Sequence, residues 1–70
     1  MSLEIKDTGK VKTFDNFKGV GFITREKGKD VFFLYEDVID GIHLYPGDCV
    51  NFFVKKGSKG PRAYNIGKDV

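Results

Sequence analysis

Five short apolar stretches, separated by turn signals at regular spacing, run through this sequence. They cover residues 10–14, 20–24, 31–35, 49–55 and 63–66. Most are rich in β-branched and aromatic residues, as strands are, and no window long enough for a helix has a convincing apolar stripe. One helical or 3-10 turn is expected at 36–39. Because a flat sheet would leave one face wet and its edges open, the pattern predicts an all-β, five-stranded closed barrel.

The length of the chain and its small number of cysteine and histidine residues limit how such a barrel can be stabilised. The chain has 70 residues, with Cys49 as its one cysteine and His43 as its one histidine. That length allows a single domain, 1–70, which buries only about 60% of its unfolded surface. A disulfide within the chain is excluded, and a structural zinc site needs about four Cys or His ligands. We therefore expect a core built by packing alone, with no metal and no cofactor.

Charge and hydropathy narrow the class of protein. Lys and Arg number 12 against 10 Asp and Glu, which gives a net charge of +2 and permits nucleic acid without demanding it. No apolar run approaches the ~18 residues of a membrane span, and no signal peptide is apparent. We expect a cytoplasmic protein without a membrane partner.

Gly19 and Gly21 lie in a strand pattern and suit close backbone approach. No catalytic constellation is found, so an enzyme is not expected.

Alternation along the strands assigns their side chains to two faces. The core face takes Val11, Gly21, Ile23, Val31 and Phe33. The opposite face then carries an aromatic cluster bordered by lysines, made of Phe14, Phe22 and Phe32 with Lys10, Lys12 and Lys18.

An exposed cluster of three Phe on a small protein suggests a binding surface. Aromatic side chains on a sheet stack with bases at about 1–3 kcal/mol per base, without reading sequence. Nearby lysines meet the phosphates, and that contribution weakens as salt rises. The alternative is that the face assignment has slipped by one residue and that these Phe belong to the core.

Four segments resemble the motifs of cold-shock domains. Residues 18–23 resemble the first ribonucleoprotein motif, K-G-F-G-F-I, and residues 31–35 resemble the second, V-F-V-H-F. Residues 9–15 resemble the opening segment, G-K-V-K-W-F-N, and residues 59–66 the closing strand, K/R-G-P-Q-A-A-N-V. The four occur in the family's order and spacing, so the resemblance spans about 9–66.

The resemblance implies a five-stranded antiparallel OB-type barrel that binds single-stranded RNA or DNA on strands one to three. It further implies an RNA-chaperone role with effects on transcription or translation. Carried over by position, the platform comprises Lys12, Phe14, Lys18, Phe22, Phe32 and Tyr35. Asp30 adds polar contacts at the edge, and Lys59, Pro61 and Arg62 flank the platform from the last loop.

The sequence departs from the family pattern at several stacking positions. Thr13 stands in place of Trp, Val20 in place of Phe, and Leu34 in place of His. The loop before the fourth strand is about two residues shorter, and residues 41–43 occupy the region of its usual Phe. Weaker or altered single-strand binding is therefore predicted.

A second hypothesis is a protein-interaction or self-associating barrel with weak nucleic-acid affinity. The aliphatic replacements favour it, and Phe53 is predicted to face outward, against a loop, Tyr45 or Tyr64, or in a dimer interface. A monomer is expected and a dimer stays open. Charge is also uneven, because residues 55–62 hold four basic and no acidic side chains, while 36–48 hold four acidic ones and no Lys or Arg. The basic run is a candidate guide for a phosphate backbone.

Overall fold

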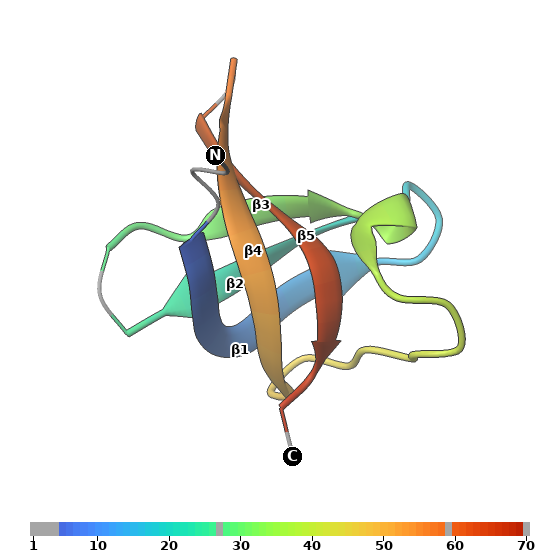
Figure 1. Ribbon diagram of the computed structural model, residues 1–70. Helices are drawn as coiled ribbons and strands as arrows, with labels where there is room; N and C mark the ends of the chain where they lie inside the picture. Colours follow the sequence, from blue (N-terminus) through green and yellow to red (C-terminus); the bar gives the residue numbers. More distant parts are fainter. Residues whose placement is uncertain (1–4, 27, 59, 70) are drawn as a thin grey trace.

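Five strands close into a barrel in the computed structural model, which describes residues 5–26, 28–58 and 60–69 (Figure 1). The elements are β1 (Ile5–Asp15), β2 (Val20–Arg25), β3 (Val31–Leu34), the 3-10 helix η1 (Tyr35–Asp37), β4 (Cys49–Gly57) and β5 (Gly60–Lys68). The predicted all-β barrel is confirmed, and the short helical turn is present one residue earlier than expected. Within these described ranges, no helix is long and apolar enough to cross a membrane.

The strand order around the barrel is β1-β2-β3-β5-β4. The long β1 serves two neighbours, because its first half pairs with β4 from Ile5↔Val54 and its second half pairs with β2 up to Asp15↔Val20. The β2–β3 and β4–β5 pairs are also antiparallel. The closing pair, β3 with β5, is parallel through Phe32↔Arg62. Four of the five strand pairs are thus antiparallel, in agreement with the predicted antiparallel OB-type barrel, and β3–β5 is the parallel seam that closes it.

The core lies inside the barrel and is wholly apolar among the described residues. Its buried side chains come from all five strands and from the segment between η1 and β4: Val11, Ile23, Val31, Phe33, Leu44, Val50, Phe52, Ala63 and Ile66. The inward positions predicted by alternation in β2 and β3, and at Val11 in β1, are confirmed. Packing of this apolar set holds the barrel together.

Gly21 allows two aromatic rings to meet across the sheet. It lies between Phe14 and Phe33 in the strand ladder. A Cβ on Gly21 would approach the Phe33 ring and the Thr13 carbonyl oxygen to 2.5 Å. The missing side chain lets Phe33 lie over this position, with its ring centroid 5.6 Å from that of Phe14. The expected role of this glycine in close backbone approach is confirmed.

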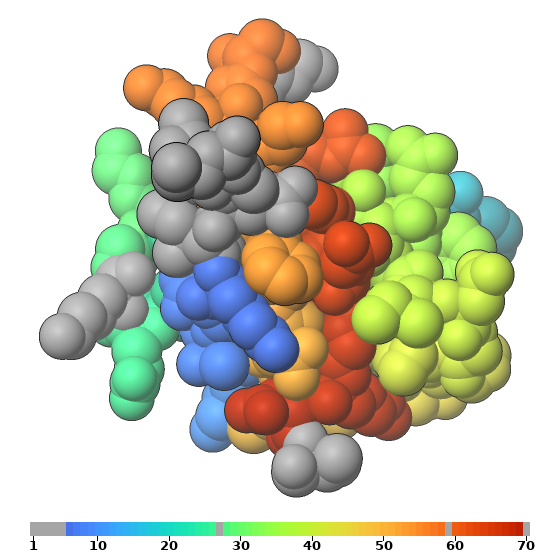
Figure 2. Space-filling view, viewed as in Figure 1, coloured from blue at the N-terminus to red at the C-terminus, as the bar shows by residue number. Residues whose placement is uncertain are grey.

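The segment after η1 packs along β5. Val38 forms a parallel bridge with Ile66, and the Ile39 N–H donates to the Ile66 carbonyl at 3.0 Å. Figure 2 shows β4 and β5 side by side in orange and red, with the yellow-green atoms of this segment alongside β5. The segment therefore borders one end of the barrel, next to the C-terminal end of β3.

Candidate nucleic-acid interface

A β-bulge in β1 decides which face Phe14 occupies. The β1–β2 register passes from Val11↔Ile23 to Thr13↔Phe22, with a shift between Val11 and Thr13. Thr13 therefore lies beside Phe22 on the outer face, and Phe14 lies beside the buried Gly21. The prediction that Phe14 shares the solvent face with Phe22 and Phe32 is wrong, because a bulge inserts one residue and reverses the alternation after it.

The outer faces of β1, β2 and β3 carry an aromatic and aliphatic surface. Phe22 and Phe32 are cross-strand partners whose rings meet edge to face at 5.8 Å between centroids. Phe22 is 44% exposed and Phe32 is half-buried. Thr13 is next to Phe22 in the ladder, and the pair Val20↔Leu34 lies one row further along the same face. We call this set the outer patch: Thr13, Val20, Phe22, Phe32 and Leu34.

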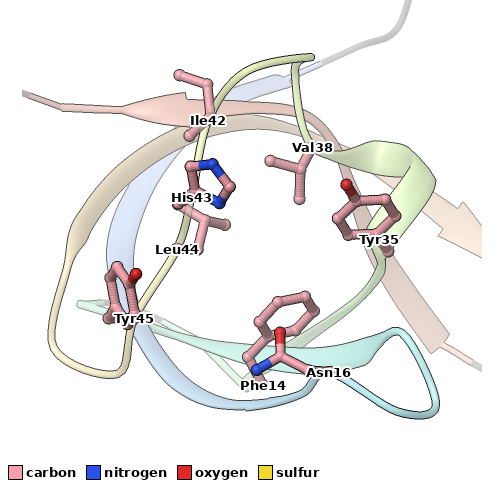
Figure 3. A pocket seen from close by; sticks show the side chains of 8 residues that line it. All are labelled: Phe14, Asn16, Tyr35, Val38, Ile42, His43, Leu44 and Tyr45. Carbon is pink, nitrogen blue, oxygen red and sulfur yellow. The ribbon is translucent and has the colours of Figure 1, made fainter.

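Phe14 contributes to a different surface at the end of the barrel. Its ring stacks between Phe33 and the exposed Tyr35, whose centroid is 6.4 Å away. The side chains around it enclose a pocket of about 230 Å³, which we call the end pocket (Figure 3). It is lined by Phe14, Asn16, Tyr35, Val38, Ile42, His43, Leu44 and Tyr45.

Five of the residues that line the end pocket come from the loop before β4, namely Val38, Ile42, His43, Leu44 and Tyr45. In Figure 3, His43 and Tyr45 stand across the open space from Tyr35, and the Asn16 amide lies at its near edge. His43 is exposed. Its place opposite Tyr35 was not predicted, since only the folded loop brings 43–45 to the end of β3.

The lysines that were predicted to lie beside the outer patch differ in whether they are paired. Lys10 and Lys18 are exposed, and neither forms an ion pair with another residue of the described chain. The Lys12 ammonium lies 3.0 Å from the Asp30 carboxylate, so these two predicted contact residues meet each other. Because exposed pairs are worth only about 0–1 kcal/mol, this pair separates easily when a phosphate competes for Lys12.

Arg62 is bound to carboxylates of the protein itself. Its Nε and Nη2 donate to the two oxygens of Asp37 at 3.0 and 2.9 Å, and Nη2 lies 3.5 Å from Glu36. Hydrogen bonding to Asp37 is the largest cause that raises the pKa of Arg62 above its ordinary value. Arg62 and the half-buried Pro61 lie in β5, so their predicted location in the last loop is wrong. Lys59 lies outside the described residues.

One large exposed residue was missed by the sequence reading. Phe17 is fully exposed (102%) in the turn between β1 and β2. Alternation describes strands and gives no information on turns, so it ignored this position. The signal that was available is the residue type itself, since Phe is rare in a turn bounded by Asn16 and Lys18.

No group of three or more His, Cys, Asp or Glu in the described part of the chain is arranged to hold a metal ion. Cys49 is a free, exposed thiol at the start of β4. Phe53 is half-buried, with its ring 6.2 Å from that of Tyr64, one of the packing partners that the sequence suggested.

The chain matches a known family and is similar to individual proteins that carry its name. The family model of the 'Cold-shock' DNA-binding domain matches residues 7–68. The cold shock-like protein of Thermotoga maritima is 43% identical over 60 residues, which are 83% of this chain and 91% of that protein. Cold shock-like protein CspE of Bacillus anthracis is 46% identical over 63 residues, 87% and 94% of the two chains.

The fold recurs in a more distant structure. The solved structure of drosophila Unr CSD456 superposes with a TM-score of 0.79 at 21% identity. It matches 97% of this chain, which spans 28% of that longer one. At this identity the likeness concerns the fold of the barrel alone.

Proposed function

The chain belongs to the cold-shock domain family, whose members bind nucleic acids, and on that premise we propose that it binds single-stranded RNA or DNA in the cytoplasm. The observation that carries the proposal is the Phe22–Phe32 pair on the outer face, flanked by Thr13. Two aromatic side chains partly open to solvent on adjacent strands present surfaces on which successive bases stack.

The outer patch and the end pocket give the strand a continuous route. Leu34 of the outer patch is followed directly by Tyr35 of the end pocket. A strand that stacks on Phe22 and Phe32 therefore extends past Leu34 toward Tyr35 and His43. Lys10, Lys12 and Lys18 supply the phosphate contacts beside the aromatic groups.

Binding of this kind acts on RNA structure without catalysis or ATP. A protein that binds unpaired strands and not duplexes stabilises the unpaired form by mass action. The chain therefore disfavours hairpins, as an RNA chaperone does, and regulates transcription or translation wherever a hairpin controls them. The outer patch has two aromatic side chains, because Thr13, Val20 and Leu34 replace stacking groups, so affinity is lower than for a full platform.

The proposal is tested by titrating a fluorescently labelled short oligo-dT with protein across a salt series. Phe22→Ala and Phe32→Ala should each weaken binding by about tenfold, which is one lost stack. Ile39→Ala is the matched control, because Ile39 is 49% exposed, close to the 44% of Phe22, but lies along β5. Unchanged affinity in both Phe variants, with the fold verified by circular dichroism, contradicts the proposal.

The second candidate function is a protein-interaction or self-associating barrel. The specific observation that favours it is the aliphatic share of the outer patch, contributed by Val20 and Leu34. Sedimentation at several protein concentrations separates the two functions. A stable dimer that ignores oligo-dT supports the second candidate, and a monomer that binds oligo-dT supports the first.

A further inference from the structure

We propose that Phe17 is a base-stacking residue, and that the hollow between Phe17 and Phe22 holds one nucleobase of the bound strand. This inference rests on the proposed function, because it assigns a further subsite beside the outer patch. Nothing in the strand pattern or the motif resemblance points to this turn residue.

The turn that carries Phe17 is held in a defined conformation. The backbone N–H groups of Phe17 and Lys18 both donate to Asp15 Oδ1, at 2.9 and 3.1 Å. The Gly19 N–H donates to the Asp15 carbonyl at 2.8 Å, and Gly19 takes the positive φ of +68° that glycine allows. The backbone under Phe17 is thus fixed before any ligand arrives, which lowers the entropy lost on binding.

Phe17 has no structural reason to be aromatic. Its side chain is fully exposed and is absent from the core cluster and from the aromatic pairs of the described residues. A large apolar side chain held in water on an ordered turn costs solubility without stabilising the fold. Its ring is therefore available to a ligand.

The space beside Phe17 suits a planar ligand. Phe17 and Phe22 line one open hollow of about 590 Å³, and Thr13 and Val20 line it as well. Thr13 and Val20 are the two positions where the cold-shock motifs carry Trp and Phe, so the strands contribute two small side chains where rings are usual. The turn therefore supplies an aromatic ring, that of Phe17, next to the two strand positions that lack one.

The charge around the hollow favours a nucleic acid strand over an apolar protein segment. Lys18 follows Phe17 directly and makes no ion pair within the described chain. Asp15 also lines the hollow, but one of its carboxylate oxygens already accepts two backbone hydrogen bonds. The hollow is continuous with Phe22, so a base bound there belongs to the same strand that stacks on the outer patch.

The test compares substitutions of Phe17 in oligo-dT titrations. Phe17→Ala should weaken binding by about tenfold, Phe17→Leu should weaken it similarly because Leu is apolar but lacks a π-face, and Phe17→Tyr should bind like the original protein. The thermal midpoint should be the same in all three variants, since the side chain buries nothing. The slope of log K against log salt should not change in Phe17→Ala, whereas Lys18→Ala should reduce it by about 0.7.

Each outcome separates this inference from the function on which it rests. If Phe22→Ala weakens binding and Phe17→Ala does not, the inference fails and the proposed function stands. If Phe17→Leu binds as tightly as the original protein, the contact is not stacking and the inference is overturned. If neither Phe22→Ala nor Phe17→Ala changes affinity, the proposed function fails. A dimer in sedimentation that dissociates in Phe17→Ala identifies a second copy as the occupant and also overturns the inference.

Discussion

The Phe14 ring is stacked on Phe33 and Tyr35 at the end of the barrel, whereas the Phe22 ring lies on the outer patch, partly open to solvent. Truncating a packed aromatic side chain removes buried area and leaves a cavity. Phe14→Ala should therefore lower the free energy of unfolding by about 2–4 kcal/mol, and Phe22→Ala by less than about 1 kcal/mol. Urea denaturation measures both. A loss for Phe14→Ala no larger than that for Phe22→Ala would contradict the packed position that the bulge gives Phe14.

Thr13 allows the opposite experiment, a gain of binding. It is exposed and lies beside Phe22 on the outer face. Thr13→Trp should add one stacking group there and tighten oligo-dT binding by about tenfold. Because the new ring would fill the hollow next to Phe17, Phe17→Ala should cost less in this background than in the original chain. Fluorescence titration of the original protein, the two single variants and the double variant measures the coupling between positions 13 and 17. Unchanged affinity in Thr13→Trp would contradict the predicted gain of binding.

Single residues of the site were predictable where side chains alternate regularly between the two faces of a strand. Phe22 and Phe32 follow the alternation of short, regular strands, and their outward positions are confirmed. Phe14 did not follow it, since the backbone decides where a bulge forms and residues 10–14 carry no glycine or proline to mark one. His43 and Tyr45 reach the end pocket only through the path of a loop, which residue periodicity does not encode.

Among the elements, η1 is joined to two strands by one carboxylate. Asp37 accepts a hydrogen bond from the Leu34 N–H at 2.8 Å and two from the Arg62 guanidinium. The Asp37 side chain is 9% exposed, so its removal leaves these donors without their acceptor in a partly buried environment. The carboxylate thereby connects the end of β3, η1 and the start of β5, close to the parallel seam that closes the barrel.

Removing that carboxylate should weaken the seam. Asp37→Ala is expected to lower the free energy of unfolding by about 2 kcal/mol, the usual cost of losing hydrogen bonds to a charged group. Glu36→Ala is the matched control, because Glu36 also faces Arg62 but is 74% exposed at 3.5 Å, and its loss should cost under about 0.5 kcal/mol. Thermal unfolding followed by circular dichroism measures both. Equal losses in the two variants would contradict the bridging role of Asp37.

The existence of the strands was predictable, and their limits were not. The first half of β1 is polar at Lys6, Asp7 and Thr8, yet it pairs with β4. Such a segment has no apolar period to detect, because its side chains are mostly exposed and its backbone pairing supplies the hydrogen bonds. Likewise, Gly60 and Pro61 read as a turn but form the beginning of β5.

At the scale of the whole molecule, the barrel separates two aromatic surfaces. The outer patch lies on β1, β2 and β3, and the Phe53–Tyr64 contact lies on β4 and β5. Exposed lysines accompany both surfaces, because Lys10 lies on β1 and Lys18 in the turn after it, while Lys6 is the ladder partner of Phe53 and Lys55 lies two residues after Phe53 in β4. A nucleic acid strand should nevertheless choose the first surface, because Phe22 is 44% exposed, whereas Phe53 is half-buried with its ring against Tyr64.

That choice is tested most directly by a ¹H–¹⁵N chemical-shift titration with a short oligo-dT. We expect the largest perturbations at the backbone amides of Thr13, Phe22 and Phe32 and in the turn that carries Phe17, while the amides of Phe53 and Tyr64 keep their positions. A spectrum that does not change on addition of oligo-dT, or perturbations centred on Phe53 and Tyr64, would contradict the assignment of the outer patch as the nucleic-acid interface.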